Sequence, residues 1–390
     1  MQLSRRLIAL GATTAIILAA CTGSSPSTAP STAPSVAPSV APSVAPSVAP
    51  STPASEAPSA SAAMDYSSWK ACVAFDTGGL GDKGFNDLAK KGLDEAAALG
   101  FKVAQSEAKG STDYAANIQR LIDQGCKSII TVGFNQAQAT VDAVKANPDI
   151  AFGQVDTTWD TTNNGPIPAN FTGLDFQIDQ AAMLAGYLVA GWSKTGIMGT
   201  YGGQQFPGVT RFMDGYAAGI AYYNKEKGTT VKLLGWDAAK QTGQFVGGDN
   251  PWGDAAKGEQ LAKNFVDQGA DVVGPVAGST GNGSIKYMLS VKKWAIGVDT
   301  DQAISLAEDA GAILTSAQKV IDAAVLDTFK ANAAGTMGGA NYEGTLANGG
   351  VAISPFHTFD SLVSADLKAG ITALQGKLVD GSVKVADYLK

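Results

Sequence analysis

The stretch Val73-Ala-Phe-Asp-Thr-Gly-Gly-Leu-Gly-Asp-Lys-Gly-Phe-Asn86 joins a short apolar run to a glycine-rich turn and the start of a helical pattern. The apolar run ends at Phe75 and is followed by an acid, Asp76, while the helical pattern opens on Phe85. In an α/β protein, ligands bind beyond the carboxyl ends of the strands, at the mouth of the sheet. The stretch therefore predicts part of a ligand-binding site.

The order of strand and helix repeats along most of the chain. Strand-like runs end at Phe75, Val103, Val132 and Val155, and helical patterns lie between them at 85–99, 113–123 and 136–146. After residue 172 the cycle restarts, with helices expected at 177–192, 209–223, 258–267 and 284–290 and strands at 196–201, 231–234, 271–276 and 294–298. This α/β alternation predicts parallel sheets with helices on both faces.

The number of units is too large for one sheet, so we expect two doubly wound lobes. The N-terminal lobe would hold residues 65–174 and 303–335, and the C-terminal lobe residues 175–302 and 345–390. The chain would cross between them near 173–177, 299–303 and 335–347. Two such lobes joined by several crossings enclose a hinged cleft, which is typical of a protein that closes on a small molecule.

The N-terminus has the pattern of an exported lipoprotein. Arg5 and Arg6 precede the apolar residues 7–20, which are too few for a spanning helix of about 20 apolar residues. Leu18-Ala-Ala-Cys21 matches a lipobox, in which Cys21 is lipidated and becomes the mature N-terminus. We expect residues 1–20 to be a signal peptide and the lipid to hold the protein on the extracytoplasmic face of the cell membrane.

Residues 21–64 differ in composition from the rest of the chain. After Cys21 they are almost entirely Ser, Ala, Pro, Thr and Val, with Ala-Pro-Ser-Val recurring. A segment without aromatic residues cannot build a core, so we expect a disordered tether. The formal net charge of the chain is −7, and no basic run is present, so a nucleic acid is not an expected partner.

The three cysteines are Cys21, Cys72 and Cys126. Cys72 and Cys126 lie in or just before two strands that are candidates for neighbours, and the expected compartment is oxidising. Bridging adjacent parallel strands strains a disulfide. The sequence therefore leaves two alternatives, a Cys72–Cys126 disulfide or two buried thiols.

Enzymatic and cofactor functions find little support. Gly79-x-Gly81-x-x-Gly84 follows a strand and opens a helix, as a dinucleotide-binding fingerprint does. However, Asp76 and Asp82 stand where a pyrophosphate would need the helix N-terminus to itself. The chain has one histidine, His357, and lacks a nucleophile elbow, a Walker A motif and a metal-ligand cluster. We expect a structural role for His357, no metal and no cofactor.

Several motifs in order resemble one known family. The loop Asp76-x-Gly-Gly-x-x-Asp-Lys-Gly-Phe-Asn86 resembles the signature of the basic membrane protein family, the nucleoside-binding lipoproteins of ABC importers. Further similar segments follow in the same order at 130–134, 147–156, 185–187, 202–207, 215–219, 276–283, 296–302 and 315–319. Each is weak alone, and their order and spacing together are specific.

The resemblance implies a fold similar to the type I periplasmic binding proteins, with a purine nucleoside sandwiched in the cleft. By analogy with the family, Asp76, Phe85, Asp299 and Lys319 are the strongest candidate ligand-binding residues. Phe85 would stack on the base, and Asp299 and Lys319 would hydrogen-bond the ribose. Further candidates are Asn86 and, more weakly, Asp156 at the base edge, together with Gly133, Phe134 and Gly278 in the family-like turns.

The second stacking residue lies in a segment that departs from the family pattern. Residues 243–254 are expanded there and offer two aromatic side chains, Phe245 and Trp252. We expect Phe245 to be the second stacking residue, with Trp252 as the alternative. The altered segment also leaves the identity of the ligand open.

The sequence thus predicts a monomeric solute-binding lipoprotein that delivers a purine nucleoside to an ABC permease and performs no chemistry on it. Two alternatives stay open. In the first, the same scaffold binds a sugar or another small metabolite. In the second, the protein is a ligand sensor that presents its closed lobes to a membrane receptor.

Overall fold

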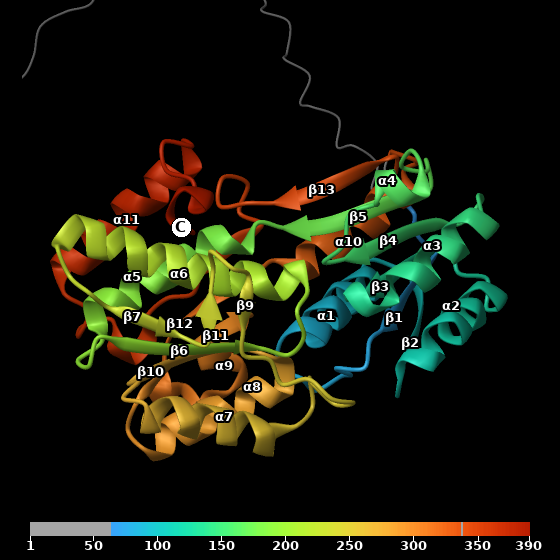
Figure 1. The fold of residues 1–390 in the computed structure, drawn as a ribbon. Coiled ribbons are helices and arrows are strands. Elements are labelled where there is room, and N and C mark those ends of the chain that lie inside the picture. The colour runs from blue at the N-terminus through green and yellow to red at the C-terminus, as the bar shows by residue number, and fades with distance from the viewer. Residues whose placement is uncertain (1–63, 337) are drawn as a thin grey trace, which may run out of the picture. The chain divides into compact units, whose positions relative to one another are not determined.

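The computed structural model describes residues 64–336 and 338–390 (Figure 1). The expected signal peptide, Cys21 and most of the tether lie outside the described residues. In the part of the chain that is described, no helix is long and apolar enough to cross a membrane.

The first sheet contains six parallel strands in the order β13-β5-β4-β3-β1-β2. Its strands are β1 (Lys70–Phe75), β2 (Lys102–Glu107), β3 (Ser128–Val132), β4 (Ala151–Val155), β5 (Phe171–Phe176) and β13 (Ala340–Gly344). Its helices are α1 (Phe85–Ala98), α2 (Tyr114–Asp123), α3 (Ala137–Ala146), the short α4 (Thr161–Asn164) and α10 (Ile321–Ala333).

Alternation along β1 shows how the first sheet is covered on both faces. Cys72 and Ala74 pack into a cluster with residues of α2 and α3, whereas Val73 and Phe75 belong to the cluster that includes α1 and α10. Every residue of β1 after Lys70 is buried. A buried strand with two covered faces has to be apolar throughout, as the sequence indicated.

The second sheet has the order β14-β12-β11-β10-β6-β7, and only β14 is antiparallel to its neighbour. Its strands are β6 (Ile197–Gly202), β7 (Lys232–Leu234), β10 (Val272–Val276), β11 (Trp294–Asp299), β12 (Ile313–Lys319) and β14 (Val351–Ile353). Helices α5 (Ile178–Trp192), α6 (Pro207–Lys227) and α11 (Ala365–Val379) lie over one face, and α7 (Ala255–Asp267) and α8 (Gly278–Ser290) over the other (Figure 1).

Two smaller features follow strands of the second sheet. The hairpin β8 (Trp236–Asp237) and β9 (Thr242–Gly243) follows β7, and the short α9 (Gln302–Ser305) follows β11. Helices α5 and α6 pack closely because glycines meet backbone there: a Cβ on Gly186 would lie 2.5 Å from the carbonyl oxygen of Tyr216.

The strand expected to end at Val103 was placed wrongly. The observed β2 runs from Lys102 to Glu107 at the edge of the first sheet, and four of its six residues are exposed. An edge strand pairs on one side only and carries polar residues, so apolar character does not mark its extent. Similarly, α8 begins at Gly278 rather than near Ser284, because the glycine-rich segment is helical.

The expected assignment of 303–335 to the N-terminal lobe is wrong for the strand within it. β12 pairs with β11 and therefore belongs to the second sheet, and the chain then returns to the first sheet through α10, which packs on α1. This crossing lies near 319–321 instead of 299–303. The other two crossings lie between β5 and α5, as expected, and between β13 and β14.

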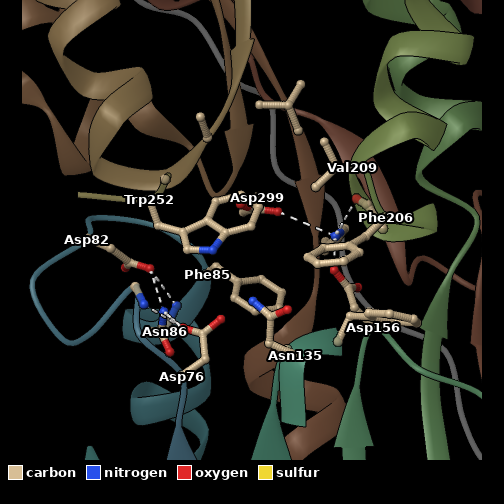
Figure 2. A pocket seen from close by; sticks show the side chains of 18 of the residues that line it. Asp76, Asp82, Phe85, Asn86, Asn135, Asp156, Phe206, Val209, Trp252 and Asp299 are labelled. Atoms are coloured by element: carbon tan, nitrogen blue, oxygen red, sulfur yellow. Dashed lines mark hydrogen bonds and ion pairs between the residues drawn. The ribbon is translucent and has the colours of Figure 1, made fainter. Parts of the chain in front are cut away.

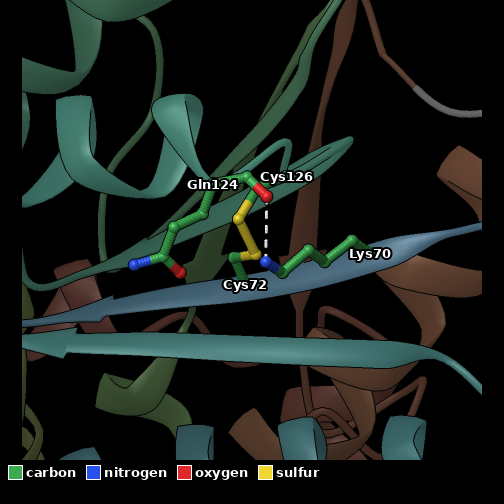
Figure 3. Close-up of a disulfide and its surroundings, with 4 residues drawn as sticks. All are labelled: Lys70, Cys72, Gln124 and Cys126. Atoms are coloured by element: carbon green, nitrogen blue, oxygen red, sulfur yellow. Dashed lines mark hydrogen bonds between the residues drawn. A yellow bond between two sulfur atoms is a disulfide. The ribbon is translucent and has the colours of Figure 1, made fainter.

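A disulfide joins Cys72 of β1 to Cys126, which precedes β3 (Figure 3). Cys126 lies before the paired part of β3, and the two Cα atoms are 6.1 Å apart, within the usual range for a disulfide. Closing a loop of 54 residues stabilises the fold by about 4 kcal/mol in the chain-entropy account. Of the two alternatives left by the sequence, the structure shows the disulfide.

Candidate ligand-binding site

A cavity of about 640 Å³, part of it open to solvent, lies between the carboxyl ends of strands from both sheets. The first wall, as we name it, comprises residues 76–86, 133–135 and Asp156, which follow β1, β3 and β4. The second wall comprises residues 203–212, Trp252, 276–278, Asp299 and Lys319, which follow or end β6, β10, β11 and β12 or lie in the loop before α7.

The cavity brings together almost all residues predicted from the sequence. Those that line it are Asp76, Phe85, Asn86, Gly133, Phe134, Asp156, Trp252, Gly278, Asp299 and Lys319. Their roles toward a ligand stay predictions. Phe245, the expected second stacking residue, does not line the cavity.

Local hydrogen bonds to carboxylates shape the loop of the first wall. Asp82 accepts from the backbone N–H groups of Gly84 (2.9 Å) and Asn86 (2.8 Å), both near the start of α1. Asp87 accepts from the N–H groups of Gly81 (2.7 Å) and Lys83 (3.1 Å). Asp82 thus satisfies donors at the start of α1, and Asp87 satisfies donors in the turn before it, so the loop is fixed by its own sequence.

Asp76, in the loop of the first wall, keeps one carboxylate oxygen free of hydrogen bonds from the described residues. Its Oδ1 accepts from the N–H of Gly78 (2.9 Å) and from Asn86 Nδ2 (3.0 Å). Its Oδ2 accepts no hydrogen bond from the described residues, and a Cβ on Gly133 would lie 2.6 Å from it. Burial raises the pKa of Asp76 to about 6, against the lowering effect of the hydrogen bonds from Asn86 and Gly78.

An ionic cluster joins the two walls. Lys319 Nζ lies 2.6 Å from Asp156 Oδ2 and 3.7 Å from Asp299 Oδ1, and only 2% of its side chain is exposed. It also lies over the rings of Phe85 and Phe212, 5.3 and 5.0 Å from their centroids. Lys319 therefore lies where the two walls meet, between the carboxylates of Asp156 and Asp299.

The two acids of this cluster have unusual backbones and raised pKa values. Asp156 and Asp299 have φ angles of +60° and +65°, which non-glycine residues seldom adopt and which cluster at functional sites. Burial raises the pKa of Asp299 to about 6, although Lys319 lowers it. Burial likewise raises the pKa of Asp156 despite the adjacent Lys319. The sequence suggested Asp156 for the base edge, whereas the structure pairs it with Lys319.

Aromatic rings occupy the middle of the cavity. Phe85 comes from the first wall and Trp252 from the second, and both line the space between the polar ends (Figure 2). Phe134 and Phe206 meet across the cleft with centroids 4.8 Å apart. Phe245 instead packs edge-on against Trp236, beside Gly202. Residues 244–246 run along the end of β6, which directs the Phe245 ring away from the cavity.

Sequence reasoning missed several residues of the second wall. Phe206, Gly208, Val209 and Phe212 line the cavity at the start of α6. Pro207 was a usable signal, because a proline at the first helical position directly after a strand marks a strand-to-helix turn. Other lining residues that were not predicted are Gly78, Asp82, Asn135, Val276 and Ala277.

Hydrogen bonds outside the ionic cluster also connect the first wall to helices α8 and α9, which lie beside the second wall. Asn282 Nδ2 donates to the carbonyl oxygen of Asp82 (3.1 Å), and Ser305 Oγ donates to that of Lys83 (2.8 Å). Both acceptors belong to the 76–86 loop. The structure therefore represents an arrangement in which the two walls are in contact.

With this geometry established, comparisons with known proteins identify the family. The family model described as ABC transporter substrate-binding protein, PnrA-like (Bmp), matches residues 70–386. The chain belongs to this family. The ABC transporter nucleoside-binding protein BmpA of Lactococcus lactis is 28% identical over 346 residues, covering 83% of this chain and 92% of that protein.

Two further proteins are similar to this chain, one in sequence and one in fold. Basic membrane protein A of Borreliella burgdorferi is 29% identical over 337 residues, covering 85% of this chain and 88% of that protein. A solute-binding protein of an ABC transporter system from Aeropyrum pernix has a similar fold, with a TM-score of 0.71 at 22% identity, covering 81% of this chain and 92% of that one.

The Bmp-family protein is accordingly an extracytoplasmic substrate-binding protein of an ABC transporter and not an enzyme. Its ligand is a small molecule and its partners are permease subunits. The predicted α/β fold of the type I periplasmic binding proteins is confirmed.

Proposed function

We propose that this protein captures a purine nucleoside between its two walls and delivers it to an ABC permease, as a monomer held to the membrane by lipid on Cys21. One observation carries the proposal. The cavity has a carboxylate–amide pair, Asp76 and Asn86, in the first-wall loop, a separate ionic cluster around Lys319, and aromatic rings beside both. A nucleoside has a matching set of parts: a base edge, a flat π surface and a ribose diol.

The charge of the cavity favours a neutral ligand over a phosphorylated one. Its lining includes four carboxylates, those of Asp76, Asp82, Asp156 and Asp299, and a single ammonium group, that of Lys319. Lys319 is already paired with Asp156. A nucleotide phosphate would meet an excess of negative charge at close range, whereas a nucleoside brings none.

The aromatic residues supply the part of the affinity that does not depend on which base is bound. Stacking of a base on an aromatic ring contributes about 1–3 kcal/mol per base. Phe85 is held at the first turn of α1, and Trp252 faces the cavity from the opposite wall. At the other polar end, Asp299 accepts hydrogen bonds from the two ribose hydroxyls, and Lys319 donates to the ribose.

Calorimetry on the chain without its signal peptide, refolded to remove any bound ligand, tests this proposal. Inosine, guanosine and adenosine should bind, whereas ribose, hexoses and nucleoside monophosphates should bind weakly or not at all. Phe85→Ala and Asp299→Ala should each weaken nucleoside binding by at least tenfold, about 1.4 kcal/mol. Asp249→Ala is a matched control, because Asp249 is exposed in the segment that carries Trp252.

A hexose that binds while all three nucleosides fail would replace the proposal with the sugar-binding alternative. The lipid anchor is tested separately. Cys21→Ala should release the protein from the membrane fraction, and a variant that stays in the membrane pellet would contradict the anchor. Size-exclusion chromatography of the delipidated chain tests the monomer.

A further inference from the structure

The indole of Trp252 is seated with one edge against the backbone of the second wall. A Cβ on Gly203 would overlap Cζ3, Cε3 and Cη2 of Trp252, so only glycine leaves room for the six-membered ring at this position. These atoms lie on the side of the indole away from Nε1. The packing therefore fixes the orientation of the ring and directs its N–H away from Gly203.

Trp252 Nε1 is buried and has no hydrogen-bond partner in the described part of the chain. Figure 2 shows this nitrogen on the side of the indole that faces Asp76 and Asn86. Buried N–H groups in native proteins are almost always paired, so an unpaired donor that lines a cavity indicates a ligand acceptor.

A second unpaired atom lies in the same part of the cavity. Asn86 is 1% exposed, and its Nδ2 donates to Asp76 Oδ1 (3.0 Å) and Asp82 Oδ2 (3.1 Å). Because both amide hydrogens are used on carboxylates, the orientation of the amide is determined and Oδ1 is an acceptor. This Oδ1 is also buried and unpaired among the described residues. The free Oδ2 of Asp76 is a further acceptor beside it.

The two walls together thus offer one donor, Trp252 Nε1–H of the second wall, on the side that faces the acceptors on Asn86 and Asp76 of the first. A complementary base edge presents an acceptor followed by donors. The edge of a 6-oxopurine has this pattern, with O6 as acceptor and N1–H as donor, and guanine adds the donor N2–H₂. Adenine presents the reverse pattern, with the N6–H₂ donor beside the N1 acceptor.

We infer that the Trp252 indole N–H donates to O6 of a 6-oxopurine nucleoside, so that the protein selects inosine and guanosine over adenosine. This inference rests on the proposed function. It makes Trp252 a directional donor at the base edge, because an indole that donates its in-plane N–H to the base edge does not at the same time stack on that base. A phenylalanine at this position would fill the space without supplying the donor. Buried polar groups that are left unpaired by the wrong ligand are an effective source of specificity.

The decisive variant is Trp252→Phe, which keeps an aromatic face and removes the donor. In the wild-type protein at pH 7.5, calorimetry should show inosine and guanosine binding at least tenfold more tightly than adenosine. In Trp252→Phe their affinity should fall about five- to tenfold, while that of adenosine changes less than twofold. Trp69→Phe, remote from the cavity, is the control and should leave all three affinities unchanged.

A spectroscopic readout distinguishes the hydrogen bond from stacking. In ¹⁵N-labelled protein, the indole N–H resonance that is missing from the Trp252→Phe spectrum should shift downfield with inosine. It should shift much less with purine riboside, which lacks the 6-oxo group. A Trp252→Phe variant that weakens inosine and adenosine equally, or neither, would overturn the inference and leave the proposed function standing. Failure of every nucleoside to bind would overturn both.

Discussion

The two walls of the cleft are built in different ways. Most of the first wall comes from one segment, residues 76–86, whose backbone is held by the nearby carboxylates of Asp82 and Asp87. The second wall is assembled from segments that are far apart in sequence. It depends on tertiary packing, such as Trp252 against Gly203, and on Lys319, which pairs with Asp156 of the first wall.

Because of this difference, changes in the two walls should affect stability and ligand binding differently. The first wall is preorganised by local hydrogen bonds, so changes there should alter ligand binding more than global stability. The second wall exists only when the sheets are correctly placed, and its ionic cluster is buried. Changes in that cluster should therefore alter stability and binding together.

Lys319→Met should have the largest effect on stability. It removes the cation that lies 2.6 Å from Asp156 and 3.7 Å from Asp299, and it leaves both carboxylates buried without it. Breaking a buried ion pair in this way costs about 3–5 kcal/mol. Urea denaturation at pH 7.5 should show a loss of this size, together with loss of nucleoside binding.

The loss should be smaller at pH 5. Burial raises the pKa values of both acids, that of Asp299 to about 6, so protonation relieves the unpaired charges. Lys330→Met is the matched control, because Lys330 pairs with Asp327 at an exposed site where such a pair contributes at most about 1 kcal/mol. Equal losses in the two variants would show that the cluster does not join the walls.

The same difference explains how far the sequence could predict the site. The first wall was predicted because its strand, turn and helix start are contiguous, and Asp76, Phe85 and Asn86 meet through local geometry. The choice between Phe245 and Trp252 depended on which segment runs along the end of β6, and no local pattern encodes that pairing. The partner of Lys319 could not be predicted either, because 163 residues separate it from Asp156.

Fold prediction succeeded and failed for related reasons. Buried parallel strands such as β1 can be recognised in the sequence as apolar runs. The exposed edge strand β2 does not, and β12 was assigned to the wrong sheet because strand order is a property of the assembled fold.

Asp76→Asn should separate stability from function within the first wall. The pKa of Asp76 is about 6 in the folded protein, against an ordinary value of 3.8. A folded-state pKa above the unfolded one means that its stabilising contribution is present below about pH 4 and is lost as the pH rises through about 6. Asparagine removes this dependence. The variant should therefore match the wild type near pH 4 and be more stable at pH 7.5, by roughly 3 kcal/mol at most.

Denaturant titrations of the two proteins at both pH values measure this difference, and calorimetry should show that the stabilised variant binds guanosine at least tenfold more weakly. We expect the variant to be more stable and to bind more weakly because the buried Asp76 carboxylate lowers stability when it is ionised, while it supplies an acceptor for the ligand. Functional sites commonly lower stability in this way. A variant less stable than the wild type at pH 7.5 would mean that the Asp76 carboxylate has a structural role instead.

Asp82→Ala should give the smallest change in stability and still affect the ligand. The variant loses the acceptor for the N–H groups of Gly84 and Asn86 and for the Asn86 side chain, at a cost of about 1–2 kcal/mol, as for other helix-start acceptors. Ser364→Ala is a matched comparison, because Ser364 accepts from the N–H of Leu367 at the start of α11, outside the cavity. Both variants should lose similar stability in urea, and only Asp82→Ala should weaken guanosine binding, since it frees the Asn86 amide to rotate. If binding were unchanged, the local hydrogen bonds would not be what holds the first wall, and its preorganisation would have to come from the contacts of Asn282 and Ser305 across the cleft.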